Sequence, residues 1–186
     1  MATHVYSVWG LPQEDVRTRA KKVMDTLRLE FGGPEFDPHV TVVGAIRLSP
    51  EDALDKFKSA CKGVKAYTAH GKGISAYGKG ISTGTFLYKC VFLLLEPTPE
   101  VVGTNDHCCA HFGYNRTSTY MPHMSLLYVD LTEEEKKKAE ERVIAFDEGL
   151  GNLSFGINRL ALYKTDPEDK TLKSWEKVAE CDLEAP

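Results

Sequence analysis

The sequence lacks the features of a membrane-spanning or exported protein. Its longest apolar run, Val91–Leu95, has the length of a core strand and falls far short of the roughly 18 residues that a membrane helix needs. The first residues, MATHVYSVWGLP, have neither the basic start nor the apolar stretch of a signal peptide. We therefore expect a cytoplasmic protein without a membrane partner.

An excess of positive charge is also missing. The formal net charge is -4 and the pI is about 5.9, which argues against broad binding to the phosphate backbone of long nucleic acids. A local positive site on a negative protein can still hold a small anion. We expect a small-molecule partner, no stable nucleic-acid complex and a monomer. The length of 186 residues suits one domain, residues 1–186, with a substantial core.

Cysteines are few and scattered, which excludes a disulfide framework. Free thiols are the default expectation for these positions: Cys61, Cys90, Cys108, Cys109 and Cys181. One bridge between distant cysteines, such as Cys61 with Cys181, stays open, because the sequence does not show proximity.

Strand and helix signals alternate along the chain. Apolar periodicity, capping residues and turn residues predict strands over 4–11, 39–48, 64–70, 85–95, 123–130, 155–164 and 174–183 and helices over 13–31, 49–61, 98–112 and 132–149. The strands 64–70 and 85–95 are expected to form a hairpin around a glycine-rich loop. The order of elements in the first half recurs in the second half, which indicates two related lobes.

A short motif occurs once in each half. FDPHVTV covers 36–42 and YMPHMSL covers 120–126; both read aromatic, any residue, Pro, His, apolar, hydroxyl, apolar. Alternate residues of a strand share a face, so His39 lies beside Thr41 and His123 beside Ser125. One copy alone is typical of the solvent-exposed face of a half-buried sheet. Two copies at matching places in the half-repeats favour one paired site.

The residues of this pair suit phosphodiester chemistry. A pseudo-twofold arrangement would place the two strands on opposite walls of one cleft. Imidazole titrates near neutrality, so one ring can accept a proton while the other donates one. Hydroxyls and protonated imidazole suit phosphate oxygens. We expect no cofactor and no metal, with His123 activating water and His39 protonating the leaving oxygen; the symmetry of the motifs leaves the reverse assignment open.

The two motifs resemble the H-x-T/S-x pair of the two-histidine (2H) phosphoesterase superfamily. The wider sequence is similar to the plant cyclic phosphodiesterase family of that group through VYSVWGLP, KCVFLLLEPTPEV and NRLALYKTDPEDKTL. The resemblance implies an α+β, bilobal fold in which two antiparallel sheets with outer helices surround a central cleft. It also implies hydrolysis of ADP-ribose 1″,2″-cyclic phosphate to ADP-ribose 1″-phosphate and of nucleoside 2′,3′-cyclic phosphates to 2′-phosphates.

The same resemblance assigns roles to individual residues. His39 and His123 would be catalytic, Thr41 and Ser125 would contact phosphate oxygens, and Tyr128 and Trp9 would lie near the nucleotide. Trp9 in a strand is by default a core residue. Five positions separate His123 from Tyr128, which puts them on different faces of an ideal strand. A role for Tyr128 therefore requires the strand to end or bulge before it.

Other interpretations stay open at this stage. A 2H enzyme could act on RNA termini, by processing cyclic phosphate ends or making 2′–5′ linkages, and a nucleotide-binding module could have lost catalysis. The segment Gly71–Ser82 is longer than the family hairpin and reads as a solvated loop, or as a cationic flap carrying Lys72 and Lys79. His107 and His111 have the i, i+4 spacing of zinc ligands, but no second ligand pair follows them.

Overall fold

The computed structural model describes residues 2–76, 91–116 and 119–186. The described elements follow in the order β1 (His4–Pro12), α1 (Glu14–Phe31), β2 (Val40–Leu48), α2 (Pro50–Cys61), β3 (Tyr67–Ser75), β4 (Val91–Leu95), α3 (Pro99–Phe112), β5 (His123–Leu127), α4 (Glu133–Phe146), the 3₁₀ turn η1 (Leu150–Asn152), β6 (Ser154–Lys164) and β7 (Glu176–Asp182). The predicted alternation of strands and helices is confirmed for this part of the chain.

The strands form one antiparallel sheet that closes on itself. Its order is β1-β2-β5-β4-β3-β6-β7, and β6 also pairs with β1. Strand β6 pairs with three strands. One of its edges pairs with β1, and the other pairs with β3 along its first part and with β7 along its later part. The expected α+β fold with antiparallel strands and outer helices is confirmed. The strands of the two lobes are joined in a single sheet.

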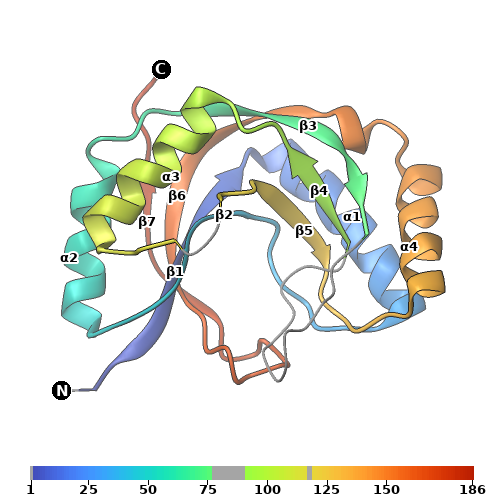
Figure 1. Ribbon diagram of the computed structural model, residues 1–186, viewed down its shortest axis with the longest axis horizontal. Helices are drawn as coiled ribbons and strands as arrows, with labels where there is room; N and C mark the ends of the chain where they lie inside the picture. Colours follow the sequence, from blue (N-terminus) through green and yellow to red (C-terminus); the bar gives the residue numbers. More distant parts are fainter. Residues whose placement is uncertain (1, 77–90, 117–118) are drawn as a thin grey trace.

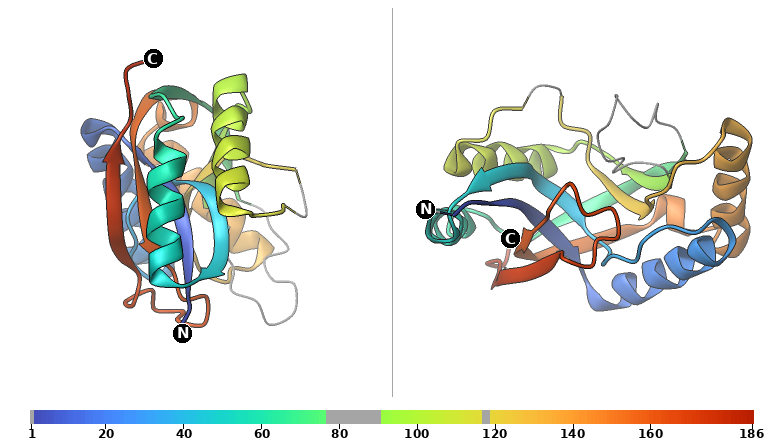
Figure 2. Two further views of the ribbon diagram at one scale, coloured as in Figure 1. Left: turned by 90° about the vertical axis from the view of Figure 1, so that its left-hand side faces the viewer. Right: turned by 90° about the horizontal axis from the view of Figure 1, so that it is seen from below.

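The arrangement has the pseudo-twofold symmetry that the repeated element order predicts. A twofold operation exchanges β1 with β4, β2 with β5 and β3 with β6, and it leaves the ring of pairings unchanged. The helices obey the same operation: α1 packs against β5 and α4, while α3 packs against β2 and α2. Helices α2 and α3 gather at one end of the molecule and α1 and α4 at the other (Figures 1 and 2).

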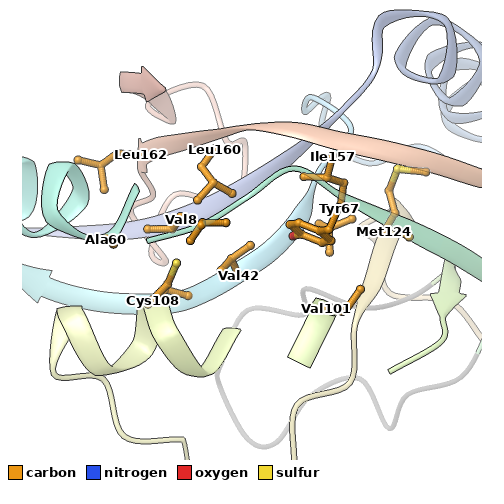
Figure 3. Close-up of a cluster of buried hydrophobic side chains, with 14 of the residues drawn as sticks. Val8, Val42, Ala60, Tyr67, Val101, Cys108, Met124, Ile157, Leu160 and Leu162 are labelled. Atoms are coloured by element: carbon orange, nitrogen blue, oxygen red, sulfur yellow. The ribbon is translucent and has the colours of Figure 1, made fainter. Parts of the chain in front are cut away.

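Two large hydrophobic cores lie between the sheet and the helices. The larger core joins β1, β2 and β6 to α2 and α3, and Val8, Val42 and Leu160 lie at its centre (Figure 3). The second core lies against α1 and α4 and includes Leu27 and Leu126. Helices therefore pack against one face of the sheet in both lobes. The opposite face is available for a functional site.

Three helices begin at the caps that the sequence predicts. The hydroxyls of Ser49, Thr98 and Thr132 each accept a hydrogen bond from a backbone N–H three residues later. Thr132 also forms a capping box with Glu135. Helix α4 ends at Phe146, three residues before the predicted end, and the separate turn η1 follows.

The glycine-rich segment is partly a strand, so the prediction of a loop there is wrong for its first residues. Strand β3 continues through Gly71 to Ser75, and Lys72 lies exposed on it. A Cβ atom on Gly71 would lie 2.6 Å from the carbonyl oxygen of Gly151. The glycine therefore permits a close approach of two backbones, as glycines in strands often do. The remainder, residues 77–82 with Lys79, lies outside the described residues, as do residues 85–90 of the predicted strand.

Cys61 and Cys181 form a disulfide that joins the end of α2 to β7, so the default of free thiols is wrong for this pair and the alternative holds. Cys108 and Cys109 are buried free thiols. Burial raises the pKa of Cys108 to about 12, which makes it unreactive. Cys90 lies outside the described residues.

In the part of the chain that the structure describes, no helix is long and apolar enough to cross a bilayer.

Candidate active site

Both motif histidines line one cavity of about 220 Å³ on the sheet face opposite the larger core. We call it the inner cavity. Its lining comes from β1, the residue before β2, β2, β5 and the segments that follow β5 and β6: Ser7, Trp9, His39, Thr41, Gly44, Ala45, His123, Tyr128, Thr165 and Trp175. The structure thus brings together five of the six residues proposed from the sequence: His39, His123, Thr41, Tyr128 and Trp9.

One backbone pairing explains why the histidines meet. Val40 of β2 is the antiparallel partner of Met124 of β5, and each is the residue after its motif histidine. Both side chains enter the larger core, so the residues on either side of them point to the opposite face. Antiparallel register also sets each motif histidine across from the hydroxyl residue of the other motif. The symmetry of the two motifs is therefore a property of the folded site.

A backbone carbonyl orients each ring in the same way. The Nδ1 atom of His39 lies 2.7 Å from the carbonyl oxygen of Asp37, and that of His123 lies 2.9 Å from the carbonyl oxygen of Met121. A carbonyl can only accept, so Nδ1 carries the hydrogen. In the neutral ring, Nε2 is then the basic nitrogen. The carbonyl belongs in both cases to the residue before the motif proline, whose extended backbone the proline ring favours.

His39 is almost completely buried, at 3% exposure. Burial lowers its pKa to about 3, and the charge of His123 acts in the same direction, although the carbonyl and the charge of Asp37 oppose both. The cost of removing a charged imidazole from water therefore prevails. His39 is neutral at physiological pH in the free protein.

Trp9 supports the His39 ring. The two rings are stacked with centroids 3.4 Å apart, and Tyr163 stacks on Trp9 at 3.7 Å. Two parallel rings at such distances must occupy opposite faces of the indole. Trp9 is also part of a small buried cluster with Leu11. Trp9 is thus both a core residue and a wall of the cavity, and a nucleotide could meet only its edge.

A bulge brings Tyr128 to the face of His123. Phe92 pairs with Ser125, but the preceding residue Val91 pairs with Leu127, so β5 holds one extra residue. An extra residue reverses the alternation of faces beyond it. The strand also ends at Leu127. The strand thus both bulges and ends before Tyr128, which is what a role for this residue requires. The ring of Tyr128 stacks on that of Phe36, with centroids 4.0 Å apart.

The two hydroxyl residues of the motifs differ in exposure. Thr41 is half-buried and lines the inner cavity. Ser125 is buried at 3% exposure and is not part of that lining. A phosphate in the cavity would therefore meet Thr41 directly, whereas Ser125 lies beneath the surface in this structure.

Three further polar or aromatic lining residues lie outside the two histidine motifs. Ser7 and Thr165 are buried, and their hydroxyls lie 3.0 Å apart. Trp175 follows the turn after β6, and its ring is tilted by 60° against that of Trp9, with centroids 5.8 Å apart. Alternation along β1 places Ser7 on the face of Trp9, but Thr165 and Trp175 arrive through long-range folding that no local pattern records.

The His107–His111 pair lies elsewhere, on α3. The rings are 4.4 Å apart, and the Nε2–H of His107 donates to the carbonyl oxygen of Ala60 at the end of α2. This contact ties the two helices together. Among the described residues, no group of three or more histidine, cysteine, aspartate or glutamate side chains could hold a metal ion.

Solved structures share this fold over nearly their whole length. Escherichia coli LigT in its apo form covers 99% of this chain and 99% of its own, with a TM-score of 0.63 and 10% identity. A structure described as a phosphoesterase has a TM-score of 0.62, 11% identity and the same coverage. TT0787 of Thermus thermophilus has a TM-score of 0.62 and 13% identity, with 98% of each chain covered. The fold is that of the 2H phosphoesterases.

The sequence comparisons give the family. Residues 4–183 match the family described as "Cyclic phosphodiesterase-like protein". The chain is also 54% identical, over 179 residues, to the cyclic phosphodiesterase of Arabidopsis thaliana, and the match covers 96% of this chain and 95% of that protein. The chain belongs to the cyclic phosphodiesterase-like family, which confirms the expectation of an enzyme that hydrolyses phosphoric diesters.

Proposed function

We propose that the protein hydrolyses ADP-ribose 1″,2″-cyclic phosphate to ADP-ribose 1″-phosphate and nucleoside 2′,3′-cyclic phosphates to nucleoside 2′-phosphates, with His39 and His123 as the acid–base pair. The observation that carries the proposal is that both imidazoles line one cavity and are oriented alike by backbone carbonyls. The similarity to the Arabidopsis cyclic phosphodiesterase supports the substrate class.

The chemistry follows from two imidazoles on either side of one phosphorus. In a 2′,3′-cyclic substrate, one ring takes a proton from water while the water oxygen bonds to phosphorus. The bond from phosphorus to the 3′ oxygen breaks, and the other ring donates a proton to that oxygen. The phosphate stays on the 2′ oxygen. Thr41 lines the same cavity, and its hydroxyl would donate its hydrogen to a phosphate oxygen.

Burial favours His39 as the base and His123 as the acid, the reverse of the assignment made from the sequence. A buried ring with a pKa of about 3 holds no proton to give before the substrate binds. His123 is half-buried, so its ring is the more solvated of the two. The ring of Phe92 meets that of His123 edge-on at 5.3 Å.

A product analysis tests the proposal. The protein is incubated with adenosine 2′,3′-cyclic phosphate and with ADP-ribose 1″,2″-cyclic phosphate in the presence of EDTA, and the products are identified by phosphorus NMR. We expect adenosine 2′-phosphate and ADP-ribose 1″-phosphate, each at the rate measured without EDTA. A 3′-phosphate product, binding without turnover, or loss of activity in EDTA would each contradict the proposal. An oligonucleotide ending in a 2′,3′-cyclic phosphate tests action on RNA termini in the same assay.

A further inference from the structure

A second, larger cavity of about 710 Å³ adjoins the inner cavity. We call it the outer cavity; its lining includes Trp9, Phe36, Tyr163, Lys170, Lys173 and Trp175. We infer that the outer cavity binds the pyrophosphate-linked half of an ADP-ribose substrate, with Lys170 and Lys173 on the pyrophosphate. This inference rests on the proposed function, because it names the subsite that an extended substrate would use.

The sizes of the two cavities support this division. The inner cavity, at about 220 Å³, is smaller than the roughly 300–1,000 Å³ of typical ligand sites. Such a space suits a ribose cyclic phosphate but not a whole ADP-ribose molecule. The rest of an extended substrate must leave the inner cavity. Trp9 and Trp175 line both cavities, so the outer cavity begins where the inner one ends.

The charges around the outer cavity favour an anion. Its two acidic residues are already paired: Asp37 with Arg17 at 3.0 Å and Lys21 at 3.7 Å, and Glu35 with Arg28 at 3.2 Å. Within the described part of the chain, neither Lys170 nor Lys173 lies within ion-pair distance of a carboxylate. Two uncompensated ammonium groups match the two negative charges of a pyrophosphate.

The loop that carries both lysines is held in one conformation. The carboxylate of Asp169 accepts hydrogen bonds from the backbone N–H and hydroxyl of both Thr171 and Ser174. The indole N–H of Trp175 donates to the carbonyl oxygen of Asp166 at 3.1 Å. The loop is therefore ordered before a ligand arrives, which lowers the entropy cost of binding.

A further cavity, which shares Thr41 and His123 with the inner cavity, is a weaker candidate. It measures about 180 Å³ and includes Arg116. The guanidinium of Arg116 already pairs with Asp106 at 3.0 Å and bonds to Asn105. Both its smaller volume and its compensated charge favour the outer cavity for the distal half of the substrate.

The test compares two substrates and two double variants. Lys170→Ala/Lys173→Ala removes the proposed contacts. Lys137→Ala/Lys138→Ala removes the same charge from exposed positions on α4 that line neither cavity. The first variant should lower kcat/KM for ADP-ribose 1″,2″-cyclic phosphate about tenfold, mainly through KM, as expected for two solvent-accessible charge contacts. Its kcat/KM for adenosine 2′,3′-cyclic phosphate should stay within about twofold, and the control should match wild type on both substrates.

Binding separates this inference from the proposed function. The Kd of ADP-ribose 1″-phosphate, measured by calorimetry, should rise about tenfold in Lys170→Ala/Lys173→Ala, while that of adenosine 2′-phosphate should not change. That result supports the subsite even if the protein turns over neither cyclic substrate. An equal loss of affinity for both ligands, or no loss for either, would overturn the inference.

Discussion

The phenol of Tyr120 donates a hydrogen bond to the backbone carbonyl oxygen of Thr41 at 2.7 Å. The amide of Asn105 donates to the next carbonyl, that of Val42, also at 2.7 Å. Both bonds fall where the pairing of β1 with β2 shifts by one residue. Burial raises the pKa of Tyr120, so the phenol stays protonated and remains a donor. Asn105 of α3 and Tyr120 of the segment after α3 thereby fix the part of β2 from which Thr41 lines the inner cavity.

Replacing Tyr120 with phenylalanine should therefore affect both stability and substrate binding. The variant leaves the Thr41 carbonyl without this partner, which should lower the free energy of unfolding by about 1–3 kcal/mol. KM for a cyclic nucleotide should rise more than kcat falls. Urea titration and steady-state kinetics measure the two effects. Tyr6→Phe is the control, since the hydroxyl of Tyr6 has no hydrogen bond among the described residues; equal behaviour of the two variants would contradict the positioning role.

The low pKa of His39 should make stability depend on pH. Below about pH 6.5 the unfolded chain binds a proton at this histidine, whereas the folded chain does so only near pH 3. The contribution is therefore fully present above pH 6.5 and is lost as the pH falls, by about 1.4 kcal/mol per unit. Between pH 7 and pH 5, wild type should lose about 2 kcal/mol more than His39→Gln. Parallel stability curves for the two proteins would show that His39 titrates normally.

Alanine substitutions at two glycines should change the stability of the protein in opposite directions. At Gly71 the new Cβ would meet the carbonyl oxygens of Gly151 at 2.6 Å and Leu153 at 3.0 Å, so Gly71→Ala should cost about 1–3 kcal/mol of unfolding free energy. Gly103 lies exposed within α3 with nothing within 4 Å of a new Cβ. Gly103→Ala should stabilise by about 0.5–1 kcal/mol. Thermal unfolding of both variants checks the pair, and destabilisation by the second would contradict it.

The Cys61–Cys181 disulfide should stabilise the fold without affecting turnover. It closes a long loop, with a sequence separation of 120 residues, and removing such a bond typically costs about 2–5 kcal/mol. Neither cysteine lines the inner cavity. Cys61→Ser/Cys181→Ser should therefore unfold at lower denaturant concentration and keep kcat within about twofold in the folded protein. An unchanged unfolding midpoint would show that the bond contributes nothing.

Local patterns in the sequence predict most of the helices and strands, and they predict that the two motif histidines lie close together. Apolar periodicity and the caps at Ser49, Thr98 and Thr132 place the helices, because these signals act within a few residues. The repeated motif predicts the shared site, since matching strands in matching half-repeats meet at a twofold axis. Val40 and Met124 mark that axis in the structure.

Long-range contacts account for what the sequence does not predict. Trp175 reaches the inner cavity through the loop after β6, and Thr165 meets Ser7 across 158 positions. Gly71 looks like a loop residue until the nearby carbonyl of Gly151 is known. The burial of His39, which sets its pKa, also depends on partners distant in the sequence.

The central claim is that His39 and His123 act together on one phosphorus. The most direct test is the turnover of adenosine 2′,3′-cyclic phosphate by His39→Ala, by His123→Ala and by the double variant. His70→Ala serves as the control, because the His70 ring is exposed and bonds to Ser154. Each single variant should lose about 10²–10⁴-fold in kcat, the double variant should lose little more than the singles, and the control should match wild type. A single variant within about tenfold of wild type would contradict the account.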